Sequence, residues 1–155
     1  MISRVITRGP VTTWVMNLLN DGAEGLLIGD AAPPPMSGWQ GDQSVGQTFK
    51  PYSVVLALAT QTIFPDFDGG ITALKFNYAV TSQGIDRAQT DAVADSLLAV
   101  FLFPDEGIRL ISTPGGDFRI GTVNLEGMGG IIRDPSTTPN RFSRIDTFSL
   151  QLEGA

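Results

Sequence analysis

The sequence predicts an α+β fold: a mainly antiparallel sheet of four or five strands, with two helices packed on one face. Two segments place apolar residues at helical spacing, and several others alternate apolar and polar residues as strands do. Long Gly/Pro-rich loops separate these elements, whose order is helix, strands, long helix, strands. The chain has 155 residues, so we expect a single domain, 1–155, large enough to bury a core.

The first predicted element is an amphipathic helix over about residues 10–20. Pro10 suits the first helical position, where a missing N–H is no loss, and Gly22 suits a C-terminal stop. The short apolar stretch Gly25–Ile28 is interpreted as a strand. The apolar stripe of the helix consists of Val11, Trp14, Val15, Leu18 and Leu19.

The middle of the chain predicts an antiparallel hairpin. Ser53–Phe64 begins apolar on both faces, as a central strand covered on both sides does. A turn signal, Pro65–Gly70, follows, and Ile71–Thr81 then alternates clearly. One face of this second strand carries Leu74, Phe76, Tyr78 and Val80.

The second helix is expected over Ile85–Phe103, with Ser82 or Gly84 as its cap. Asp86 complements the positive end of the helix dipole, and Pro104 stops the helix. Its apolar stripe consists of Ala88, Ala92, Val93, Leu97, Val100 and Phe101.

Two further strands, Phe118–Glu126 and Phe142–Leu152, complete the predicted elements. Three long loops lie between the elements: Gly29–Pro51, Pro104–Asp117 and Gly127–Arg141. Structureless loops longer than about 12–15 residues are uncommon in a compact domain and are usually functional. We therefore expect these loops to make contacts with partners.

Composition also favours a protein that works through contacts. Charged residues make up only 17% of the chain, which suits a surface covered by neighbours, although a soluble monomer with a quiet surface is the alternative. The net charge is −6 and only Lys50 and Lys75 are lysines, so a DNA-binding basic patch is not expected. An acidic wall can nevertheless let a duplex slide past it.

The chain contains no His and no Cys. His-based nucleophilic triads and zinc sites are therefore excluded, and no phosphate-binding glycine motif is present. We expect no enzyme activity, no cofactor and no metal. The longest apolar run, Leu97–Phe103, is far too short for a bilayer, so we expect no membrane association and a cytoplasmic site of assembly.

Two acidic pairs have competing interpretations. Asp66 and Asp68 precede two glycines as in a calcium loop, but further ligands are missing, so a plain turn is favoured. Asp91 and Asp95 lie one helical turn apart. They could form a glycosidase-like carboxylate pair, although a solvated or subunit-facing acidic stripe is the simpler interpretation.

Arginines and one tryptophan are the remaining candidates for an interface. Three arginines gather around the final loop and strand, near Asp134 and Asp146, where they are candidates for interface pairing, with surface solubility as the alternative. The tryptophan lies in the first long loop, either tucked onto the domain or anchoring a partner, and we favour the anchor. The candidate interface residues are Trp39, Arg87, Asp91, Asp95, Arg133, Arg141 and Arg144.

The order of elements resembles the tail terminator (tail-completion) proteins of long, non-contractile-tailed phages. The resemblance covers most of the chain, and the length of the Gly29–Pro51 loop is one departure from it. It is carried by the opening helix, the strand pair Val54–Phe64 and Ile71–Thr81, the segment Tyr78–Ala88 and the strand Arg141–Leu150.

The resemblance implies a structural virion protein of the phage neck, assembled in the host cytoplasm and without a catalytic motif. Copies of the chain would form a homo-oligomeric ring, expected to be a hexamer, that docks on the tail tube protein and stops its polymerisation. The other face would meet the head-side connector, and double-stranded DNA would pass through the lumen. Asp91 or Asp95 would line that lumen.

Three alternatives belong to other classes. A head-completion or connector protein of the same neck would differ in ring symmetry or docking partner. An enzyme would have to work with Asp and Glu alone, and a carboxylate of raised pKa in a cleft would be its sign. A free-standing binding module would rely on Trp39 and the loops, and would have an apolar pocket.

Overall fold

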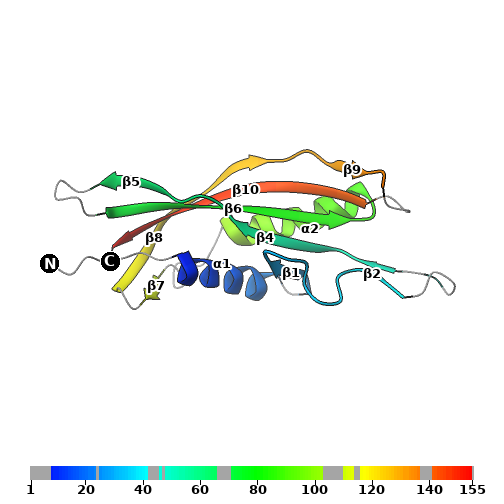
Figure 1. The fold of residues 1–155 in the computed structure, drawn as a ribbon, viewed down its shortest axis with the longest axis horizontal. Coiled ribbons are helices and arrows are strands. Elements are labelled where there is room, and N and C mark those ends of the chain that lie inside the picture. Colours follow the sequence, from blue (N-terminus) through cyan, green and yellow to red (C-terminus); the bar gives the residue numbers. More distant parts are fainter. Residues whose placement is uncertain are drawn as a thin grey trace.

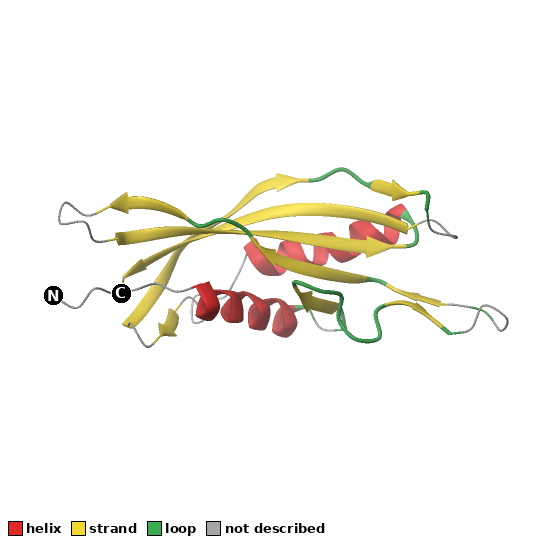
Figure 2. Cartoon of the chain, viewed as in Figure 1, coloured by secondary structure: helices red, strands yellow, loops and turns green. Residues whose placement is uncertain are grey.

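The fold is one large twisted sheet with two helices alongside it and a separate two-stranded ribbon (Figures 1 and 2). This α+β arrangement confirms the predicted fold class. The computed structural model describes residues 8–23, 25–41, 46, 48–65, 71–102, 110–113, 116–136 and 141–154.

Two long strands form the centre of the sheet: β6 (Ile71–Gly84) and β10 (Arg141–Gly154). They pair antiparallel from Phe142 opposite Gly84 to Glu153 opposite Ala73. Six shorter strands complete the sheet: β1 (Leu27–Asp30), β4 (Tyr52–Ala57), β5 (Gln61–Pro65), β7 (Leu110–Thr113), β8 (Gly116–Met128) and β9 (Ile132–Asp134).

The eight strands of this sheet occupy only six positions across it, in the order β1-β4-β6-β10-β8-β7. Each central strand has an interrupted neighbour: β4 and β5 both pair with β6, whereas β8 and β9 both pair with β10. All of these pairs are antiparallel, and β1 pairs parallel to β4. The prediction of a mainly antiparallel sheet is confirmed, although the sequence indicated fewer strands.

Both helices, α1 (Arg8–Gly22) and α2 (Arg87–Leu102), pack on the same side of the sheet. The alternation of β6 places Phe76 and Tyr78 on this side, where they are buried, and β10 adds Phe148, whose ring lies 4.5 Å from that of Phe101 in α2. The Thr12 and Tyr78 hydroxyls are 3.1 Å apart and link α1 to β6. One continuous core therefore lies between the sheet and the two helices.

Both predicted helices are confirmed, with changes at their starts. Helix α1 begins at Arg8, so Pro10 lies inside the first turn, where backbone N–H groups have no intrahelical acceptor. The cap of α2 is Asp86, because its Oδ1 accepts a 2.7 Å hydrogen bond from the Gln89 N–H. Neither Ser82 nor Gly84 is the cap, since both belong to β6.

The expected single strand Ser53–Phe64 is wrong, because the chain forms β4 and β5 with residues 58–60 between them. At this break, Leu58 N donates to Asn77 O at 2.8 Å, and the Asn77 side-chain amide donates to Ala59 O at 2.9 Å. The Asn77 side chain thus supplies one of the two hydrogen bonds at this break, where a regular β-ladder would use backbone groups alone. The hairpin of β5 with β6 is confirmed, and its turn at 66–70, with Asp66 and Asp68, lies outside the described residues.

The first long loop, Gly29–Pro51, is not structureless. It contains β2 (Gly38–Gln40) and β3 (Thr48–Lys50), which pair antiparallel as a separate ribbon. The strand expected at Gly25–Ile28 starts later, at Leu27, because Gly25 has a positive φ of 79° and turns the chain.

The other two long loops also carry short strands, β7 and β9. The predicted strands Phe118–Glu126 and Phe142–Leu152 are confirmed as parts of β8 and β10. Within the described residues, no helix is long and apolar enough to cross a membrane.

Candidate functional site

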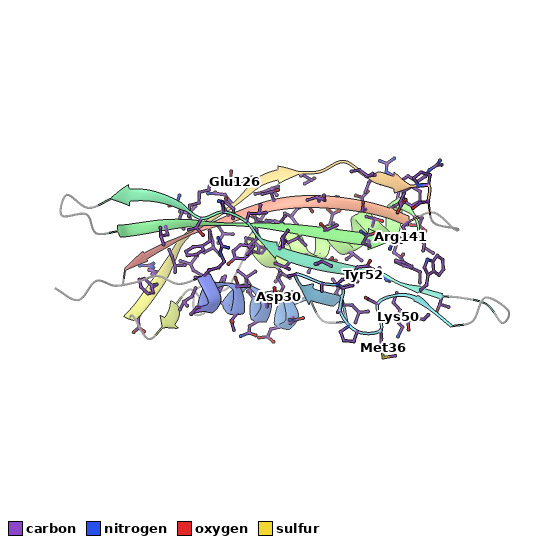
Figure 3. All side chains as sticks on the ribbon, viewed as in Figure 1. Asp30, Met36, Lys50, Tyr52, Glu126 and Arg141 are labelled. Carbon is purple, nitrogen blue, oxygen red and sulfur yellow. The ribbon has the colours of Figure 1, made fainter. Side chains whose placement is uncertain are left out.

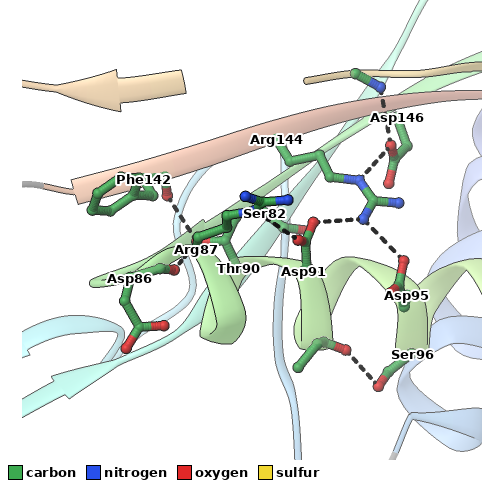
Figure 4. A network of polar contacts seen from close by, with 12 residues as sticks. Ser82, Asp86, Arg87, Thr90, Asp91, Asp95, Ser96, Phe142, Arg144 and Asp146 are labelled. Carbon is green, nitrogen blue, oxygen red and sulfur yellow. Dashed lines mark hydrogen bonds and ion pairs between the residues drawn. The ribbon is translucent and has the colours of Figure 1, made fainter. Parts of the chain in front are cut away.

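A buried arginine on β10 is the centre of the main polar cluster (Figure 4). Arg144 is 4% exposed, and its Nε donates to Oδ1 of Asp146 at 3.0 Å. Its Nη1 donates to Oδ1 of Asp91 at 3.0 Å and to Oδ1 of Asp95 at 2.9 Å. One guanidinium on the sheet therefore binds both acidic residues of α2.

The surroundings fix the charge of this cluster. Burial disfavours the charged guanidinium, but hydrogen bonds to Asp146, Asp95 and Asp91 outweigh it and raise the pKa of Arg144 above its ordinary value. Arg87 lies 3.9 Å from Asp91, and the Gly129 N–H donates to Asp146 at 3.3 Å. Three carboxylates face two guanidinium groups, so the cluster keeps one net negative charge.

The acidic pair predicted on α2 forms ion pairs with the sheet. Asp91 and Asp95 share one helix face as expected, but that face is directed toward β10 and is not an isolated acidic stripe. Asp95 still exposes 60% of its side chain, whereas Arg144 offers almost no surface to a partner. The cluster therefore acts first as a clamp between α2 and the sheet.

The predicted proximity of the last arginines to aspartates is found at two places. Arg144 contacts Asp146 as described, and Arg141 Nη2 lies 3.4 Å from Asp134 Oδ2 at the junction of β10 and β9. Hydrogen bonds from Ser136 lower the pKa of Asp134, and Arg141 lowers it further. Arg133 is exposed on β9. Of the three arginines, Arg144 is thus buried, Arg141 is half-buried and Arg133 is exposed.

The side of the sheet opposite the helices has an uncharged stretch. At one end of it, Lys75 Nζ and Glu126 Oε1 form a 2.7 Å ion pair, and at the other end lies the Arg141–Asp134 pair. Between these pairs, the described outward positions of β4, β6 and β10 carry no charged side chain. We call this region the open face, and its central residues are Val54, Leu56, Ala79, Thr81, Ile145 and Thr147.

The open face includes large apolar side chains in contact with water. Leu56 is 50% exposed and Ile145 is 45% exposed, although both lie within strands of the main sheet. The register aligns Val54 with Thr81 and Ile145, so the exposed groups lie in rows across three strands. A contiguous apolar surface of this kind is typical of an interaction site.

The ribbon of β2 and β3 extends from the start of β4 at one end of the molecule (Figures 1 and 3). The Trp39 ring lies edge-on to Phe49 with centroids 5.2 Å apart, and Phe49 in turn lies 6.2 Å from Tyr52. Trp39 is half-buried and packs on its own ribbon, so it is partly tucked onto the domain, which was the alternative to the anchor. Its exposed part remains a candidate contact.

A strained turn precedes this ribbon and holds a methionine outward (Figure 3). Met36 has a positive φ of 60° and is 69% exposed. Ser37 Oγ donates to Pro34 O at 2.6 Å, and Gln40 Nε2 donates to Ser37 O at 3.1 Å, so the turn is fixed by side chains. We call this turn, Pro34–Ser37, together with β2 and β3 the arm.

Several of these residues were missed in the sequence, although some left a signal. Ile145 falls on the polar side of the alternation Thr147, Ser149, Gln151, so it could have been recognised as an outward apolar residue. Met36 follows three prolines but carries no pattern of its own. Among the described residues, no group of three or more acidic side chains could hold a metal ion.

The fold is similar to that of solved proteins, without close sequence similarity. A chain in a structure described as the virion of a native gene transfer agent particle matches with a TM-score of 0.60 and 14% identity, covering 96% of this chain and 100% of that one. A second solved chain matches with a TM-score of 0.52 and 15% identity, covering 97% and 99%. No protein-family model and no curated protein matches the sequence.

Proposed function

We propose that this chain is a structural subunit of a phage-like particle, a tail terminator that forms a ring on the tail tube. The observation that carries this proposal is the match over the full length of a chain from a gene transfer agent virion. The element order that resembles tail terminator proteins points to the same class. In this account the ring stops tube polymerisation and joins the tail to the head-side connector in the neck.

The side chains fit a structural role better than a catalytic one. The main polar cluster contains an arginine that donates hydrogen bonds to all three of its carboxylate partners, an arrangement that links α2 to the sheet. In the described residues, the open face and the arm both expose large apolar side chains: Leu56 and Ile145 on the open face and Met36 on the arm. We therefore propose a protein without enzymatic activity or cofactor, whose partners are its own copies, the tube and the connector.

Passage of DNA through the ring is also part of this proposal. A net charge of −6 disfavours retention of phosphate. Arg144 partly neutralises Asp91 and Asp95, so we expect these two residues to contribute little of that repulsion. We therefore assign any repulsion in the lumen to the charge of the whole subunit.

A polymerisation assay tests the termination role. Purified tube protein of the source particle is allowed to elongate with and without this chain, and tube lengths are measured. A terminator shortens the tubes in proportion to its concentration, because each bound ring blocks one end. Unchanged tube lengths, with binding to purified connector instead, would favour a head-completion protein of the same neck.

A further inference from the structure

Three of the six large apolar residues that are exposed in the described part of the chain lie on two different surfaces. The large apolar residues that are exposed in the described part of the chain are Met36, Leu56, Ile85, Met128, Ile132 and Ile145. Met36 belongs to the arm, whereas Leu56 and Ile145 belong to the open face. Figure 3 places Met36 on the arm at one end of the molecule, away from Glu126.

The turn of the arm is fixed by hydrogen bonds and holds Met36 exposed. A non-glycine residue at positive φ is unfavourable, and such strain persists only where the surroundings impose it. Here the hydrogen bonds of Ser37 and Gln40 impose it, and the result is a Met side chain held in water. Met adapts its shape to a partner and is common at binding surfaces.

The open face has the matching chemistry. It is free of charge over three strands, and the ion pairs at its two ends are each internally balanced. A partner that docks here must therefore be apolar and needs no charge of its own. The turn and β2 of the arm offer such a surface: Met36 is exposed, Trp39 is half-exposed, and three prolines precede them, whereas the charged residue of the arm, Lys50, lies on β3.

We infer that the arm of one copy packs, through Met36 and Trp39, on the open face of the next copy, around Leu56 and Ile145. This inference rests on the proposed ring. A cyclic ring other than a dimer needs heterologous contacts, in which two different patches of the same chain meet. The arm and the open face are two such patches, and their separation allows one copy to use both at once.

Disulfide cross-linking tests this pairing, and the absence of native Cys makes it clean. Met36→Cys and Leu56→Cys are purified separately, mixed, oxidised and analysed on non-reducing gels. A covalent heterodimer should dominate, because a disulfide forms only when Cβ atoms approach within about 4.5 Å. Ile145→Cys replaces Leu56→Cys as a second face position. The matched control is Met128→Cys, a methionine 56% exposed on β8, which should give no heterodimer with Leu56→Cys.

The double variant Met36→Cys/Leu56→Cys gives a second readout. Head-to-tail links should produce a ladder of covalent oligomers whose last rung is the closed ring. Products that stop at a dimer, or links between two Met36→Cys chains, would overturn the inference in favour of a symmetric contact. Absence of the link in an oligomer detected by sedimentation would also overturn it, while leaving the proposed function intact.

The charge variant Met36→Lys should abolish self-assembly, because it places an unpaired charge against the apolar open face. Met36→Leu should retain assembly, and Met128→Lys is the control that should also retain it. Each variant is examined alone and on tail tubes. Normal rings of Met36→Lys would contradict the arm contact, whereas a native chain that stays monomeric with and without tubes would contradict both this inference and the proposed function.

Discussion

At the residue scale, two of the three aspartates that contact Arg144 differ strongly in burial. Asp146 is 1% exposed, whereas the side chain of Asp95 is 60% exposed. Removing one partner of a buried ion pair leaves an uncompensated charge, but an exposed partner is replaced by water. The clamp should therefore depend mainly on its buried member.

We predict that Asp146→Asn lowers the free energy of unfolding by about 3 kcal/mol, because Arg144 then lacks its buried counter-charge. Asp95→Asn, the matched control in the same cluster, should cost less than about 1 kcal/mol. Urea denaturation followed by circular dichroism measures both. Equal losses for the two variants would show that burial does not separate their roles.

The ion pair at one border of the open face predicts a pH dependence. A hydrogen bond from Lys75, with another from Ser149, lowers the pKa of Glu126 from its ordinary value of 4.5. A depressed carboxyl pKa contributes stability that is present above pH 4.5 and is lost as pH falls through the folded-state pKa.

Glu126→Gln should consequently be less stable than the native chain at pH 7, and this difference should shrink as the pH falls below 4.5. Thermal melts of both proteins between pH 3 and pH 7 provide the comparison, with Asp95→Asn as an acidic residue that forms no part of this pair. A difference that is constant over the whole range would argue against the assigned pair.

At the element scale, the link between β8 and β9 has one glycine with no space for a Cβ, Gly129, and one with open space around it, Gly130. A Cβ at Gly129 would collide with the carbonyl oxygen of Ile145, to which the Gly129 N–H donates at 2.9 Å. A Cβ at Gly130 would meet nothing within 4 Å. Beside this link, the register between β10 and β8 shifts between Thr147 and Phe148, as it does at a β-bulge.

Gly129→Ala should therefore destabilise the fold by about 1–3 kcal/mol, as overpacking does when backbone has to move. Gly130→Ala should change stability by no more than about 0.5 kcal/mol. Chemical denaturation distinguishes them, and hydrogen exchange of the Gly129 amide locates the effect. A stable Gly129→Ala variant with a protected amide would mean that β9 joins β10 differently.

The elements that could be predicted from sequence are those whose signal is long and local. Alternation over Ile71–Thr81 was sufficient to predict a strand there, and apolar spacing was sufficient to predict the two helices. Strands β2, β3 and β9 are three residues each, too short for alternation to be recognised. The break between β4 and β5 depends on the Asn77 side chain of another strand, which no local pattern reveals.

The candidate site was predictable only in part, for a related reason. The closeness of Arg144 and Asp146 follows from their positions in the chain. Contact of Arg144 with Asp91 spans 53 residues, and helical spacing indicates only that Asp91 and Asp95 share a face. The open face depends on the register of three strands, so it became visible only in the folded chain.

At the scale of the whole molecule, the sheet is covered by the described helices on one side only, and the fold is similar over its full length to a chain of a gene transfer agent virion. The helices cover the inner side of the sheet, whereas the open face and the arm expose large apolar side chains. Exposed apolar surfaces, together with buried charges that are paired within the chain, suit a subunit that assembles with other chains. We propose that this assembly is a ring at the end of a tube.

Negative-stain electron microscopy of the purified chain, alone and mixed with tail tubes of its source particle, tests that claim most directly. The account predicts closed rings, expected to be sixfold, or a cap at one end of each tube, with Met128→Lys behaving as the native chain does. A chain that forms no ring and leaves both tube ends bare, while remaining folded by circular dichroism, would contradict it.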